Sequence, residues 1–102
     1  MTQIYYNLEL IQINNVLFIP VLISIINDKV RSEFQLDEEL KGVIILDIDP
    51  DSKASEKGLM IGDVVVEVGQ KLVQTPEDFQ QQLKVSKDKG RTAALLLVKR
   101  GQ

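Results

Sequence analysis

The residues of this 102-residue chain with most potential for chemistry are its carboxylates, because the sequence contains neither histidine nor cysteine. Nucleophile triads and the common zinc sites need one or the other, so both are excluded. Two acidic pairs, Glu38-Glu39 and Glu77-Asp78, each consist of neighbours in sequence. Such neighbours are not held across a cleft in contrasting environments, as acid–base catalysis requires. We therefore predict no catalytic residues and no enzyme activity for this chain.

A third acidic group, Asp47, Asp49 and Asp51, has the alternate spacing with which a calcium-binding loop begins. Such a loop needs glycine at its sixth position and a bidentate glutamate at its twelfth. The sequence has Ser52 and Gly58 at those two positions. We interpret the group as a turn with flanking strand carboxylates, and we predict no metal and no cofactor.

Composition narrows the choice of partners. The chain carries 12 basic and 15 acidic residues, for a net charge of −3. No basic surplus is available to neutralise phosphates, which argues against nucleic acid as the main partner. Apolar residues make up 44% of the chain, a proportion typical of one folded domain of this length. The functions left are therefore binding and assembly.

The elements that must position any site are organised around residues 42–69. Residues 43–46 and 64–66 are short, β-branched apolar runs and predict two buried strands. Between them, Ser52 is expected to cap one helical turn over residues 53–57, with Gly58 after its end. Residues 59–61 are then expected to pack inward before a tight turn at Gly62-Asp63.

The flanking sequence predicts two further helices and a last strand. Asn27 or Asp28 can cap a helix over residues 29–34. Thr75 and Pro76 begin a longer helix that extends to about residue 87. Residues 92–98 are expected to form the last strand.

Residues 42–65 resemble the core of a PDZ domain of the bacterial HtrA/Do (Deg-type) serine protease family, most closely its C-terminal PDZ domain. The resemblance extends to the end of the chain and weakens before about residue 26. Lys53 stands where the family usually has proline, and Lys57 where it often has alanine. The positions that fill the family's pattern are Gly42-Val43, Asp49-Pro50-Asp51-Ser52, Ala54, Lys57-Gly58-Leu59 and Ile61-Gly62-Asp63-Val64-Val65.

The resemblance implies an α+β fold: a partly open, largely antiparallel β-barrel or sandwich capped by one longer and one or two short helices. It implies a non-catalytic module that captures extended or C-terminal peptides by β-addition. In the family such domains dock unfolded chain ends in periplasmic protein quality control, relay occupancy to a protease domain and join protomers. We expect a periplasmic location from the family alone, since the chain carries no recognisable export signal.

The resemblance also places a peptide-binding groove. It puts the carboxylate-binding loop at Ile19-Pro20-Val21, the groove strand at Val21-Leu22-Ile23, and the opposite wall at Gln80 and Leu83. Pro20 stands where the family has glycine, and proline offers no N–H and no positive φ. Binding is therefore expected to be weakened or altered. The alternative is a blocked groove in a domain that acts in assembly, with residues 19–26 forming a plain core strand and Leu83, like Phe79, lying in the core.

Residues 1–18 form an N-terminal segment of uncertain role ahead of a PDZ-like domain over residues 19–102. Apolar and polar residues alternate from 4 to 10, which is typical of a strand, and Asn14-Asn15 predicts a turn. The apolar run 16–26 is too short to span a bilayer and lacks a preceding basic residue. We expect a buried strand there rather than membrane insertion.

The family's last strand, which follows a hairpin at the position of Arg100-Gly101, is missing. Either an unpaired edge is left that invites association, or residues 4–10 take its place. We favour the second alternative, because an unused apolar tail would be costly to expose.

Overall fold

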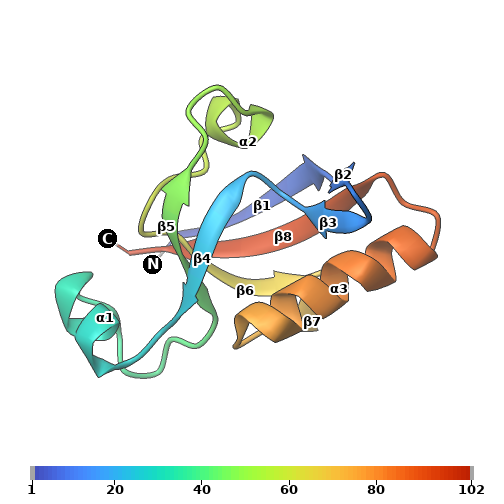
Figure 1. Ribbon diagram of the computed structural model, residues 1–102. Helices are drawn as coiled ribbons and strands as arrows, with labels where there is room; N and C mark the ends of the chain where they lie inside the picture. Colours follow the sequence, from blue (N-terminus) through green and yellow to red (C-terminus); the bar gives the residue numbers. More distant parts are fainter. Residues whose placement is uncertain (1, 102) are drawn as a thin grey trace.

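A computed structural model describes residues 2–101 (Figure 1). The main sheet is antiparallel, with strand order β1-β8-β6-β5-β4 and a short β7 paired to β6; β2 and β3 form a separate hairpin. Within these residues the sheets stay open and do not close into a barrel. The α+β class predicted from the sequence is confirmed. The strands are β1 (Thr2–Glu9), β2 (Ile11–Ile13), β3 (Val16–Phe18), β4 (Val21–Ile25), β5 (Val43–Ile48), β6 (Val64–Val68), β7 (Lys71–Leu72) and β8 (Ala93–Arg100), and the helices are α1 (Asp28–Glu33), α2 (Lys53–Glu56) and α3 (Pro76–Asp88).

Local capping chemistry defines all three helices. The side chains of Asn27, Ser52 and Thr75 accept hydrogen bonds from backbone N–H groups in the first turns of α1, α2 and α3. After α2 the chain turns at Gly58, whose φ of +100° suits glycine. These caps and this helix end were predicted from the sequence and are confirmed.

The segment after α2 corrects one expectation. Leu59 is buried, but Met60 and Ile61 are 52% and 54% exposed. The backbone N–H of Asp63 bonds the carbonyl oxygen of Met60 at 3.1 Å, which closes a β-turn. A turn directs its side chains outward, so only Leu59 reaches the core.

Two apolar layers pack on the two faces of the main sheet. On one face, α3 contributes Phe79 and Leu83 to a core built from β1, β5, β6 and β8. On the other face, Val30 and Phe34 of the α1 segment pack against a smaller cluster from β5, β6 and β8. The sheet therefore has α3 and the β2–β3 hairpin on one side and α1 on the other.

The N-terminal segment is part of the sheet. β1 pairs with β8 along its whole length, from Thr2 opposite Arg100 to Glu9 opposite Ala93. Tyr6 and Leu8 point into the core, whereas Tyr5 points outward. The favoured alternative from the sequence, in which residues 4–10 form a strand of this sheet, agrees with the pairing of β1 and β8.

The sequence analysis expected one buried strand over the apolar run 16–26, and the structure shows that this expectation is wrong. The run forms β3 and β4, separated at Ile19 and Pro20. Leu17 and Ile19 are buried, whereas Leu22 is 59% exposed. The change of direction at Pro20, which has no N–H for a ladder, splits the run between two sheets. No helix in residues 2–101 is long and apolar enough to cross a membrane.

Candidate functional site

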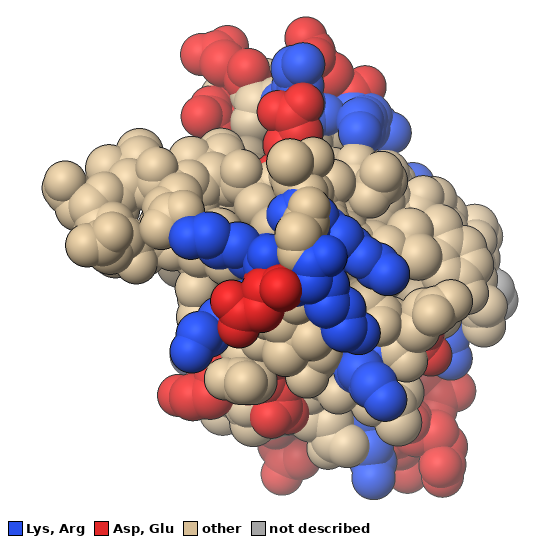
Figure 2. All heavy atoms as spheres, turned by 90° about the vertical axis from the view of Figure 1, so that its right-hand side faces the viewer, with Lys and Arg blue, Asp and Glu red and all other residues tan. Residues whose placement is uncertain are grey.

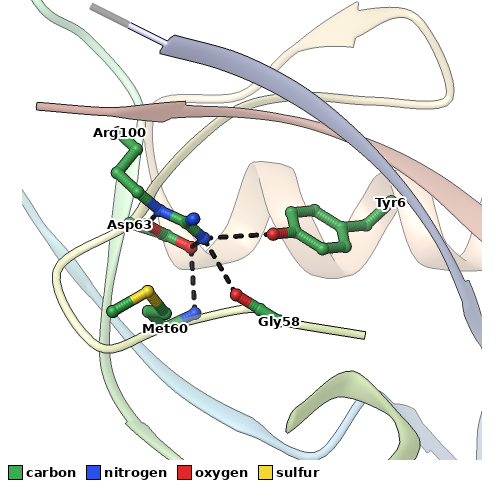
Figure 3. Close-up of polar contacts among 5 residues, drawn as sticks. All are labelled: Tyr6, Gly58, Met60, Asp63 and Arg100. Atoms are coloured by element: carbon green, nitrogen blue, oxygen red, sulfur yellow. Dashed lines mark hydrogen bonds and ion pairs between the residues drawn. The ribbon is translucent and has the colours of Figure 1, made fainter. Parts of the chain in front are cut away.

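Five residues from three separate segments of the sequence meet around one buried carboxylate (Figure 3). Asp63 is 1% exposed, and its two oxygens accept bonds of 2.7 Å each from Nε and Nη2 of Arg100. One oxygen also accepts the backbone N–H of Met60 at 2.9 Å. Nη2 of Arg100 donates further to the hydroxyl of Tyr6 at 3.0 Å and to the carbonyl of Gly58 at 2.9 Å.

The bond to Asp63 raises the pKa of Arg100, against the lowering effect of its partial burial. Both carboxylate oxygens are engaged, so this group of residues is structural: it connects β1, β8 and the turn before β6. Sequence analysis placed Asp63 in a turn and missed its partner, because 37 residues separate Asp63 from Arg100.

The candidate binding site is the free edge of β4. Among the described residues β4 pairs with one strand, β5, and α3 packs beside its other side. In an antiparallel pair half of a strand's backbone groups point away from its partner. β4 therefore presents hydrogen-bonding groups towards α3, and the apolar side chains of Leu22 and Ile25 are exposed on the same strand.

The structure brings together only part of the site expected from the resemblance. Ile19, Pro20, Val21 and Leu22 line a cavity of about 410 Å³ that also includes Phe18 and residues 47–50. Ile23 is half-buried and packs against the main core. These residues share the β3–β4 corner and the strand that follows it.

The two helix residues lie elsewhere. Gln80 lines a second cavity, of about 550 Å³, between α3 and the β2–β3 hairpin. Leu83 is 0% exposed and belongs to the core, together with Phe79. Neither helix residue lines the cavity at the β3–β4 corner, because β3 lies between that corner and the middle of α3 (Figure 1).

Sequence analysis missed the β2–β3 hairpin. Asn14 and Asn15 have φ values of +51° and +67°, as in the two-residue turns that connect hairpin strands. The Asn-Asn turn was recognised, but its strands are only three residues long, too short for periodicity to reveal. A pair of turn asparagines between two apolar stretches was the available signal.

Side chains of α3 hold the hairpin in place. The Nε2 atom of Gln80 donates to the carbonyl oxygen of Leu17. Nζ of Lys87 donates to Oε1 of Gln12 at 2.5 Å. Leu17 itself is buried in the core. The hairpin therefore lies along α3 from Gln80 to Lys87.

The loop before β4 has few free donors for a carboxylate. Pro20 has no N–H, and its carbonyl oxygen accepts the N–H of Asp49 at 3.1 Å. The N–H of Val21 donates to the carbonyl of Ile19 at 2.8 Å. Two of the three successive amides that would hold a carboxylate are therefore absent or engaged.

Basic side chains collect near the end of α3. Lys84 and Lys87 line the cavity beside the hairpin, and Lys89 and Arg91 follow the helix end. Figure 2 shows Lys and Arg atoms gathered around acidic atoms in the middle of this face. The net negative charge of the chain is thus unevenly distributed.

The fold and the β4 edge define a class of small domains that present a sheet edge beside a helix. A family model described as "PDZ domain" matches residues 23–102. The chain belongs to the PDZ domain family, whose domains are non-catalytic.

Curated relatives connect this domain to HtrA-type proteases. It is 41% identical over 59 residues to a probable periplasmic serine endoprotease DegP-like of Brucella suis, a match covering 58% of this chain and 12% of that protein. It is 43% identical over 61 residues to the putative serine protease HhoB of Synechocystis, covering 60% of this chain and 14% of that protein. The chain thus matches a small part of each relative, and the predicted resemblance to HtrA-type PDZ domains is confirmed.

Solved structures show the same fold at low sequence identity. The HtrA3 PDZ domain, bound to a phage-derived ligand, matches with a TM-score of 0.65 at 19% identity, covering 99% of this chain and 80% of that one. The second PDZ domain of Dlg1 from the choanoflagellate Monosiga brevicollis matches with a TM-score of 0.61 at 21% identity, covering 97% and 93%. The choanoflagellate SHANK1 PDZ domain, bound to a GIRK3 peptide, matches with a TM-score of 0.59 at 15% identity, covering 100% and 98%.

Proposed function

We propose that this PDZ domain binds extended peptide segments by adding them as a strand to the free edge of β4. The observation that carries the proposal is that β4 pairs only with β5 among the described residues and has α3 along its other side. Backbone bonds to such an edge supply affinity, and pockets for alternate side chains supply selectivity. Two of the structurally similar PDZ domains hold a peptide or phage-derived ligand, which supports the proposal.

The proposed contact residues divide by role. Val21, through its carbonyl oxygen, and Ile23 would pair with the peptide backbone, because their backbone groups point away from β5. The exposed Leu22 would contact peptide side chains. Ile19 and Pro20 would shape the closed end of the site. Gln80 and Leu83 would act indirectly, Gln80 by holding the hairpin and Leu83 by supporting the strand from the core.

The loop chemistry favours internal segments over chain ends. With no N–H at Pro20 and the Val21 N–H already bonded to Ile19, a terminal carboxylate gains little at this loop. A bound segment would therefore be recognised through its backbone and apolar side chains, as in an unfolded stretch of another protein. By resemblance to the relatives named periplasmic, we propose the periplasm as the place of action and a protease domain as a partner.

A second candidate function is assembly with a closed groove. The bond from Gln80 to the Leu17 carbonyl and the burial of Leu17 favour it, because they place hairpin backbone where α3 would otherwise face a ligand. In this case a peptide could not reach the first residues of β4.

Titration with peptides that end in apolar C-terminal residues distinguishes peptide binding from assembly with a closed groove. We expect saturable backbone amide shifts at Val21, Leu22 and Ile23, with dissociation constants between micromolar and millimolar, corresponding to about −8 to −4 kcal/mol. Because the carboxylate contributes little, the same peptides with amidated ends should give nearly the same affinity. Absence of any shift at millimolar peptide would refute the binding function and leave the closed-groove alternative.

Replacing Pro20 with glycine tests the role of the loop. The variant regains an N–H and access to positive φ, so we expect free-acid peptides to bind roughly 10-fold more tightly than amidated ones, as a hydrogen bond to a charged group allows. Isothermal calorimetry with both peptide forms measures the ratio. Pro76→Gly makes the same change at the start of α3, where the residue does not line the cavity of the loop; it is the control and should leave the ratio near one. An unchanged ratio in Pro20→Gly would show that the loop cannot act as a carboxylate site.

A further inference from the structure

The main sheet has a second edge, formed by β1. β1 stands at the end of the strand order opposite to β4 and pairs only with β8 among the described residues. The β4 edge has α3 beside it, whereas in the described part of the chain the α2 segment contacts one end of β1, at Asn7 and Glu9. The outer side of β1 is independent of the groove proposed above.

Backbone geometry shows which groups of β1 are unpaired. The N–H of Leu10 donates to the carbonyl of Thr92 at 2.9 Å, and these residues continue the β1–β8 register. In an antiparallel ladder, residues that bond to the partner alternate with residues whose N–H and C=O both point away. Even-numbered residues of β1 therefore bond to β8, and the odd-numbered residues point outward: Gln3, Tyr5, Asn7 and Glu9.

An independent contact agrees with this assignment. Nζ of Lys57 donates to the carbonyl oxygen of Asn7 at 2.5 Å, which places that oxygen on the open side. Nζ of Lys53 lies 4.0 Å from a carboxylate oxygen of Glu9. Lysines of the α2 segment thus shield the last part of the edge, and no comparable contact within residues 2–101 covers the outward groups of Gln3 and Tyr5.

The rest of the edge lacks the features that protect edge strands. Such strands are usually short, bulged, or marked by proline or an inward charge. β1 is eight residues long, has no proline, and pairs with β8 without a register shift. Its only charged residue is Glu9, beside Lys53. A strand with these properties is ready to accept another strand.

We propose that the β1 edge binds a second copy of this chain, antiparallel, about a two-fold axis at Tyr5. Residues directly opposite must point to the same face, so Tyr5 would face the Tyr5 of the second copy, and Gln3 its Asn7. On the inner face, Ile4 would lie opposite Tyr6 of the second copy.

These pairings favour a second copy of the chain as the partner. They are aromatic with aromatic, amide with amide and aliphatic with aromatic, and none sets like charges opposite each other. Tyr5 is 61% exposed in the single chain and would be covered at the axis. The carbonyl oxygen of Asn7 has a second lone pair, so it can accept from Gln3 of the second copy and keep Lys57.

Sedimentation equilibrium over a range of concentrations tests the proposal. The weight-average mass should rise above the 11.5 kDa of one chain towards twice that value. In Tyr5→Pro the lost N–H is one that points outward, so the ladder with β8 is kept while edge pairing is blocked. This variant should stay at the mass of one chain. The control Tyr5→Thr keeps both the N–H and the strand preference, and it should still associate.

Amide hydrogen exchange of the unmodified chain gives a second readout that does not depend on a variant. The amides of Gln3 and Tyr5 should become protected as concentration rises, whereas those of Ile4 and Tyr6 should be protected throughout. A mass that stays at one chain at every concentration would overturn the proposal. So would association that Tyr5→Pro leaves intact, or concentration-dependent protection confined to β4, which would place the interface at the groove.

Discussion

Replacing Arg100 with methionine is expected to lower the free energy of unfolding by about 3–5 kcal/mol, because it leaves a buried carboxylate without its partner. Asp63 is almost fully buried and receives two bonds from the guanidinium. Methionine preserves much of the apolar stem of arginine, so the loss would come mainly from the charge and hydrogen bonds. Tyr6 and the carbonyl of Gly58 would lose a donor as well.

Urea denaturation followed by circular dichroism measures this effect. The control Arg91→Met makes the same change of charge at an exposed position and should stay within about 0.5 kcal/mol of the parent. Adding Asp63→Asn to Arg100→Met should recover part of the loss, because a neutral amide is cheaper to bury and can still accept the Met60 N–H. A loss below about 1 kcal/mol in Arg100→Met would show that Asp63 reaches water or another partner.

Replacing Gly42 with alanine is the second change with a large expected effect, about 2–4 kcal/mol of destabilisation from overpacking against rigid backbone. A Cβ at this position would lie 2.4 Å from the carbonyl oxygen of Val65 and 2.8 Å from a side-chain carbon of Val64. Both neighbours belong to a strand in the middle of the sheet. Relief would therefore require β5 and β6 to separate where they pair.

Gly90→Ala is the matched control for this steric contact. Gly90 also has a positive φ, of +81°, but nothing lies within 4 Å of an added Cβ. The free energy of unfolding of Gly90→Ala should therefore fall only by the amount due to backbone strain, about 1 kcal/mol. Thermal unfolding of the two variants measures the difference between them. Equal losses at both positions would mean that strain, and not contact with Val65, determines the need for glycine at position 42.

Local signals in the sequence correctly indicated most of the fold. The capping residues Asn27, Ser52 and Thr75 accept hydrogen bonds from amides in the first turns of their own helices. Because these contacts join residues close in sequence, a short stretch of sequence is enough to predict them. The runs that form β5 and β6 are apolar because these strands are covered on both faces. The motif from Gly42 to Val65 was sufficient to indicate a PDZ domain, since its turns and helix cap occur at set spacings.

Predictions that depended on which segments meet were less successful. The apolar run 16–26 does not reveal that it divides at Pro20, and Met60 and Ile61 look as apolar as Leu59 although a turn exposes them. Gln80 was placed opposite the strand that follows Pro20, but it bonds to Leu17 of the hairpin. Apolar character shows that a residue prefers burial, and it does not show which surface is present to bury it.

The sequence by itself determined the helix ends, the central strands, the absence of histidine and cysteine chemistry, and the family to which the chain belongs. Only the tertiary structure decided that β1 fills the place beside β8, that the hairpin closes one side of α3, and that Arg100 partners Asp63. The first set depends on interactions within a few residues, or on composition. The second depends on contacts between residues distant in sequence, whose free energy is gained only when the whole chain packs and whose partners therefore leave no local pattern.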